Sequence, residues 1–210
     1  MRFAVLGTGQ VGSALAGKLS ALGHDVVLGS RDPASERAQA VAAKAGARVA
    51  SYADAAAHGE WLVNALPGEE AIGILSACAV DGKIMVDIAN YNSAVDQPIL
   101  VPIGEAIQAA FPKLRLVKAL NSVSAHLMVD PAALGRPHSV FVASNDVSAK
   151  AEVVALLESF GWQDIIDLGP LTEARAMEQL IPLWMALERR FGHPGFNLAV
   201  MRQDDPADGA

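Results

Sequence analysis

Three glycines near the start of the chain, Gly7, Gly9 and Gly12, constrain its fold more than any other feature. They follow the apolar run 2–6 and precede a stretch in which apolar residues recur at helical spacing. A strand that enters a helix through G-x-G-x-x-G needs glycine for the tight turn, for close approach of a ligand to the backbone, and for close packing of the helix on the strand. The sequence therefore predicts a Rossmann-type site in which the helix N-terminus holds the diphosphate of a dinucleotide.

The rest of the chain alternates short apolar runs with stretches of helical spacing. Because the runs are not polar at every second residue, they are typical of strands buried on both faces of a parallel sheet. We therefore predict an α/β fold, a Rossmann-type doubly wound and mainly parallel sheet. The expected strands are 2–6, 25–29, 47–50, 61–66, 83–88, 115–119, 139–143 and 163–168. The expected divisions are a nucleotide-binding domain over 1–120, an extension over 121–202 and a flexible tail over 203–210.

Helix ends are expected where capping residues flank the helical stretches. Asp32-Pro33 suits the start of a helix that runs to Gly46. Asn145-Asp146 suits the start of another helix, and Gly161 suits its end. The remaining expectations are a loop over 91–102 and a last helix over 172–190, with a kink or break at Pro182.

The chain has 210 residues, a formal net charge of −7 at pH 7 and one cysteine. A general nucleic-acid-binding protein needs a basic face, so this charge argues against nucleic acid as a partner. No run approaches the roughly 18 consecutive apolar residues of a membrane span. A single cysteine excludes an intramolecular disulfide and a cysteine-rich zinc site. We therefore expect a cytoplasmic protein with neither a nucleic-acid nor a membrane partner.

The end of the second expected strand indicates which dinucleotide binds. Sites for NAD usually place an acidic residue about 20 positions beyond the glycines, where it holds the ribose 2′-hydroxyl. Here the strand ends in Gly29-Ser30-Arg31, and Asp32 is expected to point away as a helix cap. The Ser30 hydroxyl and the planar Arg31 guanidinium instead suit a 2′-phosphate. The sequence therefore predicts NADP(H) as the cofactor, bound through its phosphate by Ser30 and Arg31.

Motifs along almost the whole chain resemble one known family, the coenzyme F420-dependent NADP oxidoreductases and their bacterial relatives. The motifs occur in the same order and at similar spacing as in that family. They are Gly7-Thr8-Gly9 with Gly12, Gly23-His24, Gly29-Ser30-Arg31, Val117-Lys118-Ala119-Leu120-Asn121-Ser122, Ser144-Asn145-Asp146, Asp167-Leu168-Gly169-Pro170-Leu171 and Ala174-Arg175.

The resemblance implies a Rossmann domain with a small C-terminal α/β extension packed on it, assembled as a homodimer. It also implies hydride transfer between NADPH and a deazaflavin (F420) or flavin-like ring. By position in the motifs, Thr8, Gln10 and Val11 would contact the diphosphate together with the glycines. The residues implied to border the ribose and nicotinamide are Asn64, Ala65, Leu66 and Pro67, with Ala125 from the extension.

The acid–base residues of other dehydrogenases are missing. Tyr52 and Tyr91 have no lysine four positions later, and the five histidines show no metal-ligand spacing. Glu69 and Glu70 suit a helix N-terminus better than catalysis, and Lys118 suits a structural or a substrate-contacting role equally. Because transfer between two rings can rely on stacking and distance, we expect no catalytic side chain and no metal.

The acceptor ring is expected to lie against the nicotinamide at the carboxyl ends of the strands. Backbone segments 65–68, 89–91 and 121–125 should form the walls of this cleft. The residues expected there are Ala89 and Asn90 on the nucleotide side, and Gly68, Tyr91, Asn121, Ser122 and the titratable His126 on the acceptor side.

Two alternatives to the F420 or flavin-like acceptor remain open. One is an NADPH-dependent reductase of a ferric chelate, a free flavin or another small-molecule acceptor. An imine is disfavoured, because related imine reductases need a long helical C-terminal domain and this chain has a mixed α/β pattern after Asn121. The other alternative is a regulator that senses NADP without turnover, since the missing catalytic residues suit it equally.

Overall fold

The computed structural model describes residues 1–92 and 100–203, and these form one α/β fold around an eight-stranded sheet. The strand order is β3-β2-β1-β4-β5-β6-β7-β8, and neighbouring strands are parallel except for the antiparallel pair β6 and β7. The strands are β1 Arg2–Leu6, β2 Asp25–Ser30, β3 Arg48–Ser51, β4 Trp61–Asn64, β5 Ile84–Asp87, β6 Arg115–Ala119, β7 Ser139–Ala143 and β8 Asp164–Asp167. The predicted fold class is confirmed.

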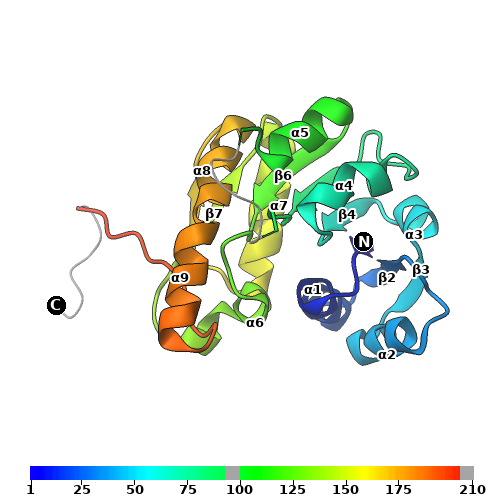
Figure 1. The fold of residues 1–210 in the computed structure, drawn as a ribbon, viewed down its shortest axis with the longest axis horizontal. Helices are drawn as coiled ribbons and strands as arrows, with labels where there is room; N and C mark the ends of the chain where they lie inside the picture. Colours follow the sequence, from blue (N-terminus) through cyan, green and yellow to red (C-terminus); the bar gives the residue numbers. More distant parts are fainter. Residues whose placement is uncertain (93–99, 204–210) are drawn as a thin grey trace.

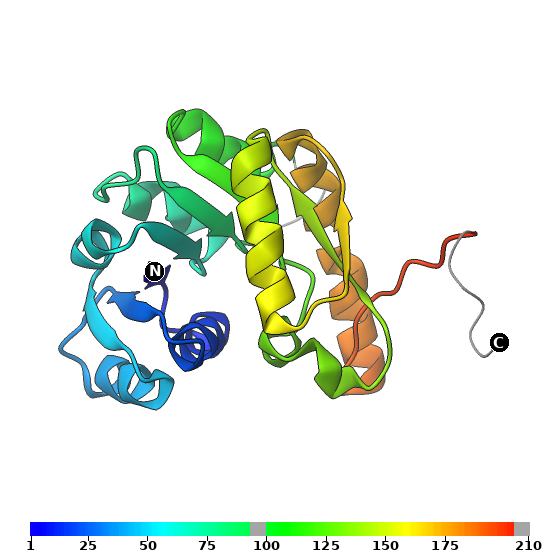
Figure 2. The ribbon, with the colours of Figure 1, turned by 180° about the vertical axis from the view of Figure 1, so that it is seen from behind.

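Helices cover both faces of the sheet (Figures 1 and 2). The helices α1, α2, α6 and α7 pack on one face, and α3, α4, α5 and α8 on the other. The α-helices are α1 Gln10–Ala21, α2 Glu36–Ala45, α3 Tyr52–His58, α4 Gly68–Leu75, α5 Ile103–Ala110, α6 Ala125–Val129, α7 Val147–Phe160, α8 Ala174–Gln179 and α9 Ile181–Phe191. Two 3-10 turns, η1 Pro131–Leu134 and η2 Leu171–Glu173, precede β7 and α8.

Each central strand sends alternate side chains into two separate cores. In β1, Phe3 and Val5 belong to the core under α1 and α7, whereas Ala4 and Leu6 belong to the core under α3 and α4. All four side chains are fully buried. A strand between two helical layers must be apolar on both sides, which is why its sequence shows a continuous apolar run.

Local capping explains where the helices begin and end. The α2 helix begins after Ser35, whose hydroxyl accepts a hydrogen bond from the backbone N–H of Ala38 at 3.3 Å. The predicted cap Asp32 is therefore wrong: its carboxylate accepts from the N–H of Ala34 in the turn before the helix. Asp146 does cap α7, as predicted, and accepts from the N–H of Ala149 at 2.8 Å.

The last helical stretch is divided, as its internal proline predicted. The chain leaves α8 at Leu180, and Pro182 lies in the first turn of α9. A proline at the start of a helix removes an N–H that would have no intrahelical partner anyway. Residues 93–99 of the loop expected at 91–102, and residues 204–210 of the expected tail, lie outside the described residues.

The segment after residue 120 continues the sheet. β7 joins β6 through two residue pairs, Lys118 with Ala143 and Ala119 with Val142, and β8 then lies parallel to β7. The seam is strengthened by Ser144, whose hydroxyl donates to the Leu116 carbonyl at 2.6 Å. The expected division at residues 120 and 121 therefore coincides with a reversal of strand direction within one sheet.

Candidate functional site

At Gly7 and Gly12 the chain between β1 and α1 is packed too closely for any side chain. Gly7 has a φ of +121°, and a Cβ there would lie 2.6 Å from the carbonyl oxygen of Ala65. A Cβ on Gly12 would lie 2.0 Å from the carbonyl oxygen of Gly7. The loop, the first turn of α1 and the chain after β4 therefore touch through backbone alone.

Gly9, at the start of α1, is open to ligand. It is the N-cap residue, no side chain caps the helix there, and a Cβ at this position would meet nothing within 4 Å. The first turn of this 12-residue helix holds no acidic residue. Because the first N–H groups of a helix lack intrahelical partners, the mouth of α1 presents free donors and a positive dipole end. This cradle fits the diphosphate of a dinucleotide, with Thr8, Gln10 and Val11 around it.

The end of β2 presents the two residues expected to bind a 2′-phosphate. Ser30 is buried, and its hydroxyl accepts from the backbone N–H of Asp32 at 3.2 Å. Arg31 lies outside, with its side chain 76% exposed, and its Nη2 donates to Glu70 Oε2 at 2.5 Å. Glu70 belongs to the first turn of α4, where it was expected to stabilise a helix N-terminus. Its pairing with Arg31 was not anticipated.

A cavity of about 390 Å³ leads from the mouth of α1 across the carboxyl ends of β5 and β6 to α9. A volume of this size is typical of small-molecule sites. Of the residues expected at the site, those that line it are Gln10, Val11, Asn90, Tyr91, Asn121, Ala125 and His126. The other lining residues are Ile88, Val123, Ser124, Met128, Ile181, Trp184, Met185, Glu188 and Pro194.

Other residues expected at the cleft lie outside this cavity lining. Gly68 begins α4, and a Cβ there would lie 2.7 Å from the Asn90 carbonyl oxygen, which accepts from the Gly68 N–H. Ser122 is buried beside the lining residue Asn121. Asn64 ends β4, residues 65–67 follow it, and Ala89 lies just after β5 at the same edge of the sheet.

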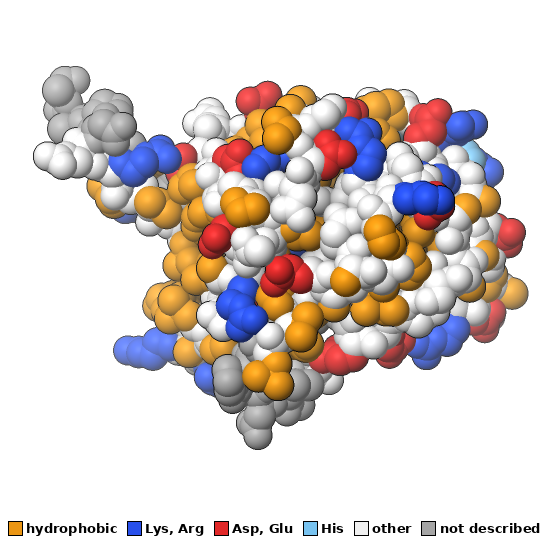
Figure 3. All heavy atoms as spheres, turned by 90° about the horizontal axis from the view of Figure 1, so that it is seen from above, with side chains coloured by type: hydrophobic (Ala, Val, Ile, Leu, Met, Phe, Trp, Pro, Cys, Tyr) orange, Lys and Arg blue, Asp and Glu red, His pale blue; other side chains and the backbone are white. Residues whose placement is uncertain are grey.

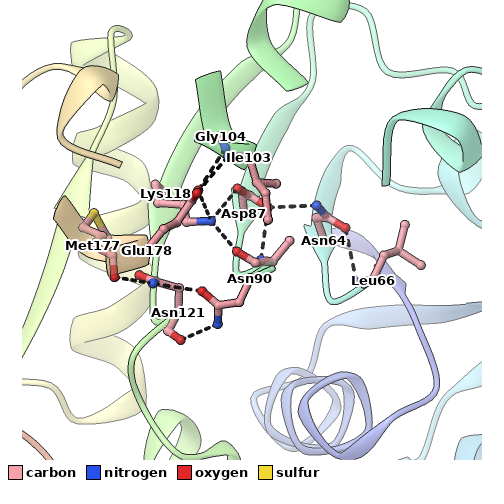
Figure 4. Close-up of polar contacts among 11 residues, drawn as sticks. Asn64, Leu66, Asp87, Asn90, Ile103, Gly104, Lys118, Asn121, Met177 and Glu178 are labelled. Carbon is pink, nitrogen blue, oxygen red and sulfur yellow. Dashed lines mark hydrogen bonds and ion pairs between the residues drawn. The ribbon is translucent and has the colours of Figure 1, made fainter. Parts of the chain in front are cut away.

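Two asparagine side chains join the loops that wall the cavity (Figure 4). Asn90 Nδ2 donates to the Asn121 carbonyl oxygen at 2.7 Å, and Asn121 Nδ2 donates to Asn90 Oδ1 at 3.1 Å. Asn121 Nδ2 also reaches the carbonyl oxygen of Met177 in α8, at 2.8 Å. Leu120, just before Asn121, has a φ of +60° and is the one non-glycine residue with a positive φ among residues 1–92 and 100–203. The hydrogen bonds of the Asn90 and Asn121 side chains fix the backbone next to Leu120 and so support its sparsely populated conformation.

Behind the asparagines lies a fully buried ion cluster, also drawn in Figure 4. Lys118 Nζ lies 3.0 Å from Asp87 Oδ2 and 2.9 Å from Glu178 Oε1, and it donates to the Ala89 carbonyl at 2.5 Å. Burial alone lowers the pKa of Lys118, but the Asp87 and Glu178 carboxylates outweigh that effect and leave its pKa above the ordinary value. The lysine is therefore charged, and it has a structural role, one of the two that the sequence left open.

Glu178 and Asp87 each bring backbone into the cluster. Glu178, on α8, accepts from the N–H groups of Ile103 and Gly104 at 2.8 and 3.1 Å, so it lies at the N-terminus of α5. Asp87 Oδ1 accepts from Asn64 Nδ2 at 2.8 Å. The cluster thus fixes the segment after β4 and the segment after β5, and the second of these supplies Asn90 and Tyr91 to the cavity wall.

The wall supplied by α9 was missed from the sequence. The helix was expected from its spacing, but no contribution of it to the cleft was predicted. No residue of α9 is fully buried, and Ile181, Trp184 and Met185 instead line the cavity. A tryptophan and a methionine in a helix just after a proline break were the available signal.

Charged side chains of both signs share the surface of the molecule (Figure 3). Acidic and basic side chains intermingle on the face drawn in Figure 3. In the described part of the chain, no group of three or more His, Cys, Asp or Glu residues is arranged to hold a metal ion. Over the same residues, no helix combines the length and the apolar character needed to cross a membrane.

Known proteins resemble the chain in both sequence and structure. A family model for coenzyme F420-dependent NADP oxidoreductases matches residues 2–91. The crystal structure of a proposed F420-dependent NADP-reductase from Arthrobacter sp. FB24 is 43% identical with a TM-score of 0.88, covering 95% of this chain and 99% of that one. The chain belongs to this family. The membership that the motifs predicted is confirmed.

More distant relatives of this family member differ in length. The F420-dependent NADP reductase of Methanocaldococcus jannaschii is 27% identical over 222 residues, which cover 95% of this chain and 98% of that protein. Metalloreductase STEAP2 of Homo sapiens is 31% identical over 180 residues, covering 84% of this chain and 35% of that protein. The chain thus spans about a third of the length of the metalloreductases it matches.

The buried cluster makes a testable demand on stability. Lys118→Met should destabilise the fold by about 3–5 kcal/mol, because it leaves two buried carboxylates without their countercharge. The matched control is Lys113→Met, which removes an exposed lysine 2.9 Å from Asp81 and should cost no more than about 1 kcal/mol. Urea unfolding measures both. Equal, small losses would contradict the assignment of Lys118 as a buried, charged group.

Proposed function

We propose that this family member transfers hydride between NADP(H) and a deazaflavin (F420) or flavin-like acceptor, whose ring lies against the nicotinamide. The observation that carries the proposal is the cavity of about 390 Å³ that begins at the α1 mouth and ends on Trp184 and Met185. One end suits a diphosphate and the other a flat apolar ring. The cytoplasmic location expected from the sequence is part of this proposal.

The proposed roles of the chain are binding and orientation. When bound, NADPH would supply the hydride. The N–H groups at the mouth of α1 hold its diphosphate, and the Asn90–Asn121 pair fixes the wall against which the rings lie. The apolar residues of α9 exclude water from that wall. Distance and stacking then provide the rate enhancement that a fixed near-attack geometry allows.

The ionisable residues along the described cavity wall suit this role. Tyr91 donates its hydroxyl proton to the Val101 carbonyl, and burial raises its pKa, with the Glu178 and Glu69 carboxylates adding to the shift. The phenol therefore stays neutral and engaged. His126 and Glu188 line the same cavity. Reduction of the acceptor ring adds one proton besides the hydride, and water can supply that proton, so neither side chain is required as its donor.

Arg31→Ala is expected to weaken NADPH binding by about 1.5–3 kcal/mol while leaving NADH binding nearly unchanged, because only the phosphorylated nucleotide loses a charged hydrogen bond. Titration calorimetry with both nucleotides measures this. The control is Arg48→Ala, at another exposed arginine, 3.0 Å from Asp25 at the start of β2. Equal losses for NADPH and NADH would contradict the proposed phosphate site.

The similarity to metalloreductase STEAP2 favours a second candidate acceptor, a ferric chelate. A sensor that binds NADP without turnover remains the alternative outside enzymology. An acceptor panel separates these three proposals, because each makes a different prediction for NADPH consumption.

Oxidised F420, FMN, FAD and a ferric chelate are each mixed with NADPH and the full chain, and loss of NADPH absorbance is followed. We expect turnover with F420 or a flavin. Turnover with the ferric chelate alone would contradict a deazaflavin or flavin acceptor and would favour reduction of ferric iron. Saturable NADPH binding without oxidation of any acceptor would contradict an enzymatic role and favour the sensor.

We further propose that the chain forms a homodimer through α9. This helix runs along the outer edge of the fold (Figures 1 and 2), and the chain after it returns to β7, where Ser139 bonds to the backbone of Leu198 and Val200. Leu183 and Phe191 on α9 are 49% and 51% exposed, and Met201 beyond it is 82% exposed. A two-fold axis would pack α9 of one protomer against α9 of its partner, and this contact would bury the exposed apolar side chains of both helices.

Leu183→Asp should convert the dimer to a monomer, because a carboxylate at the centre of an apolar interface is left without a partner. Light scattering coupled to gel filtration measures the mass. Val147→Asp is the control: Val147 is 77% exposed at the start of α7, where an acidic residue is favourable. A wild-type chain that elutes as a monomer would contradict this proposal.

A further inference from the structure

The ion pair between Arg31 and Glu70 spans the glycine loop that is proposed to bind the nucleotide. Arg31 directly follows β2, and Glu70 lies in the first turn of the helix that follows β4. In the sheet, β1 lies between these two strands, and the glycine loop leaves its carboxyl end. The pair, with 2.5 Å between Nη2 and Oε2, therefore bridges the two sides of that loop.

A third side chain, that of Tyr52, lies near both Arg31 and Glu70. Tyr52, at the start of α3, packs against Gly29, where a Cβ would lie 3.0 Å from the ring. Burial raises the pKa of Tyr52, and the Arg31 guanidinium opposes that shift while the Glu70 carboxylate adds to it. Both charges thus lie close to one aromatic side chain at the end of β2.

The contact between Arg31 and Glu70 is made through Nη2, so a phosphate that binds the Nη2 edge of the guanidinium must share that donor with the carboxylate or displace it. A carboxylate and a phosphate bind the same planar fork of N–H donors. A 2′-phosphate that approaches Arg31 therefore either competes for Nη2 or binds the remaining N–H groups beside the negative charge of Glu70, and both arrangements are opposed by the carboxylate. NADH carries no such phosphate and leaves the pair intact.

We propose that Glu70 is a specificity-determining residue that competes with the 2′-phosphate of NADP(H) for Arg31. The inference rests on the proposed function, because it requires the phosphate to bind at Arg31. The Glu70 carboxylate lowers the affinity for NADPH and leaves the affinity for NADH unchanged. It therefore reduces the ratio of NADPH to NADH affinity. Glu70 also holds the exposed Arg31 guanidinium beside the glycine loop when no phosphate is bound.

Glu69 provides a matched control for this proposal. It belongs to the same first turn of α4 and carries the same charge, but its Oε1 accepts from the backbone N–H of Asn92 at 2.6 Å. If Glu70 acted only by stabilising the helix N-terminus or by general repulsion of phosphate, neutralising either residue would have a similar effect. Competition for Arg31 predicts an effect at Glu70 alone.

The test measures dissociation constants of NADPH and NADH for the wild-type chain, Glu70→Gln, Glu69→Gln, Arg31→Ala and the double variant Arg31→Ala with Glu70→Gln. Glu70→Gln should tighten NADPH binding about two- to five-fold, the range expected for release of an exposed ion pair, and leave NADH within experimental error. Glu69→Gln should leave both nucleotides nearly unchanged. Glu70→Gln should have no effect when Arg31 is already alanine.

Salt adds an independent readout. The gain from Glu70→Gln should shrink at about 1 M salt, where the screening length is roughly 3 Å. No gain at low salt, or a gain that persists without Arg31, would overturn the competition. If Arg31→Ala alone leaves the ratio of NADPH to NADH affinity unchanged, the phosphate site itself fails. If Arg31→Ala lowers that ratio but Glu70→Gln does not raise it, only the competition fails.

Discussion

One buried ammonium group connects the nucleotide-binding half of the fold to its last helices. Lys118 lies between Asp87 of β5 and Glu178 of α8, and none of the three is exposed by more than 1%. Removing such charges from water is unfavourable unless each remaining donor and acceptor is satisfied. Here the carboxylates also receive backbone and amide N–H groups, so the cluster is complete only when β4, β5, β6, α5 and α8 are all in place.

The geometry of the cavity follows from that cluster. Segments after three neighbouring strands end at the ion cluster or at the asparagine pair beside it, and α8 is bound to both through Glu178 and Met177. The helix that follows, α9, therefore begins from a fixed point and supplies the far wall. A cleft prepared in this way suits a reaction that depends on the distance between two rings, because little of the orientation must be gained on binding.

The sequence predicted the fold better than it predicted the site. All eight strands were expected to within two residues, because strands buried on both faces must be apolar throughout. The cap of α2 was misplaced because Asp32 and Ser35 are both good caps, and the choice between them depends on the turn before the helix. Partners such as Glu178 for Lys118, or Glu70 for Arg31, could not be predicted, since only the tertiary fold brings these distant residues together.

The glycine loop and the cavity wall formed by α9 should differ in how well they tolerate substitutions. At Gly7 and Gly12 backbone lies directly against backbone, so no mutation there can be absorbed by a neighbouring side chain. The wall formed by α9 consists of side chains, which can be exchanged one at a time while the chain path is kept. Under the proposed function, substitutions in the α9 wall would alter the acceptor site one side chain at a time, while the backbone contacts of the glycine loop would stay as they are.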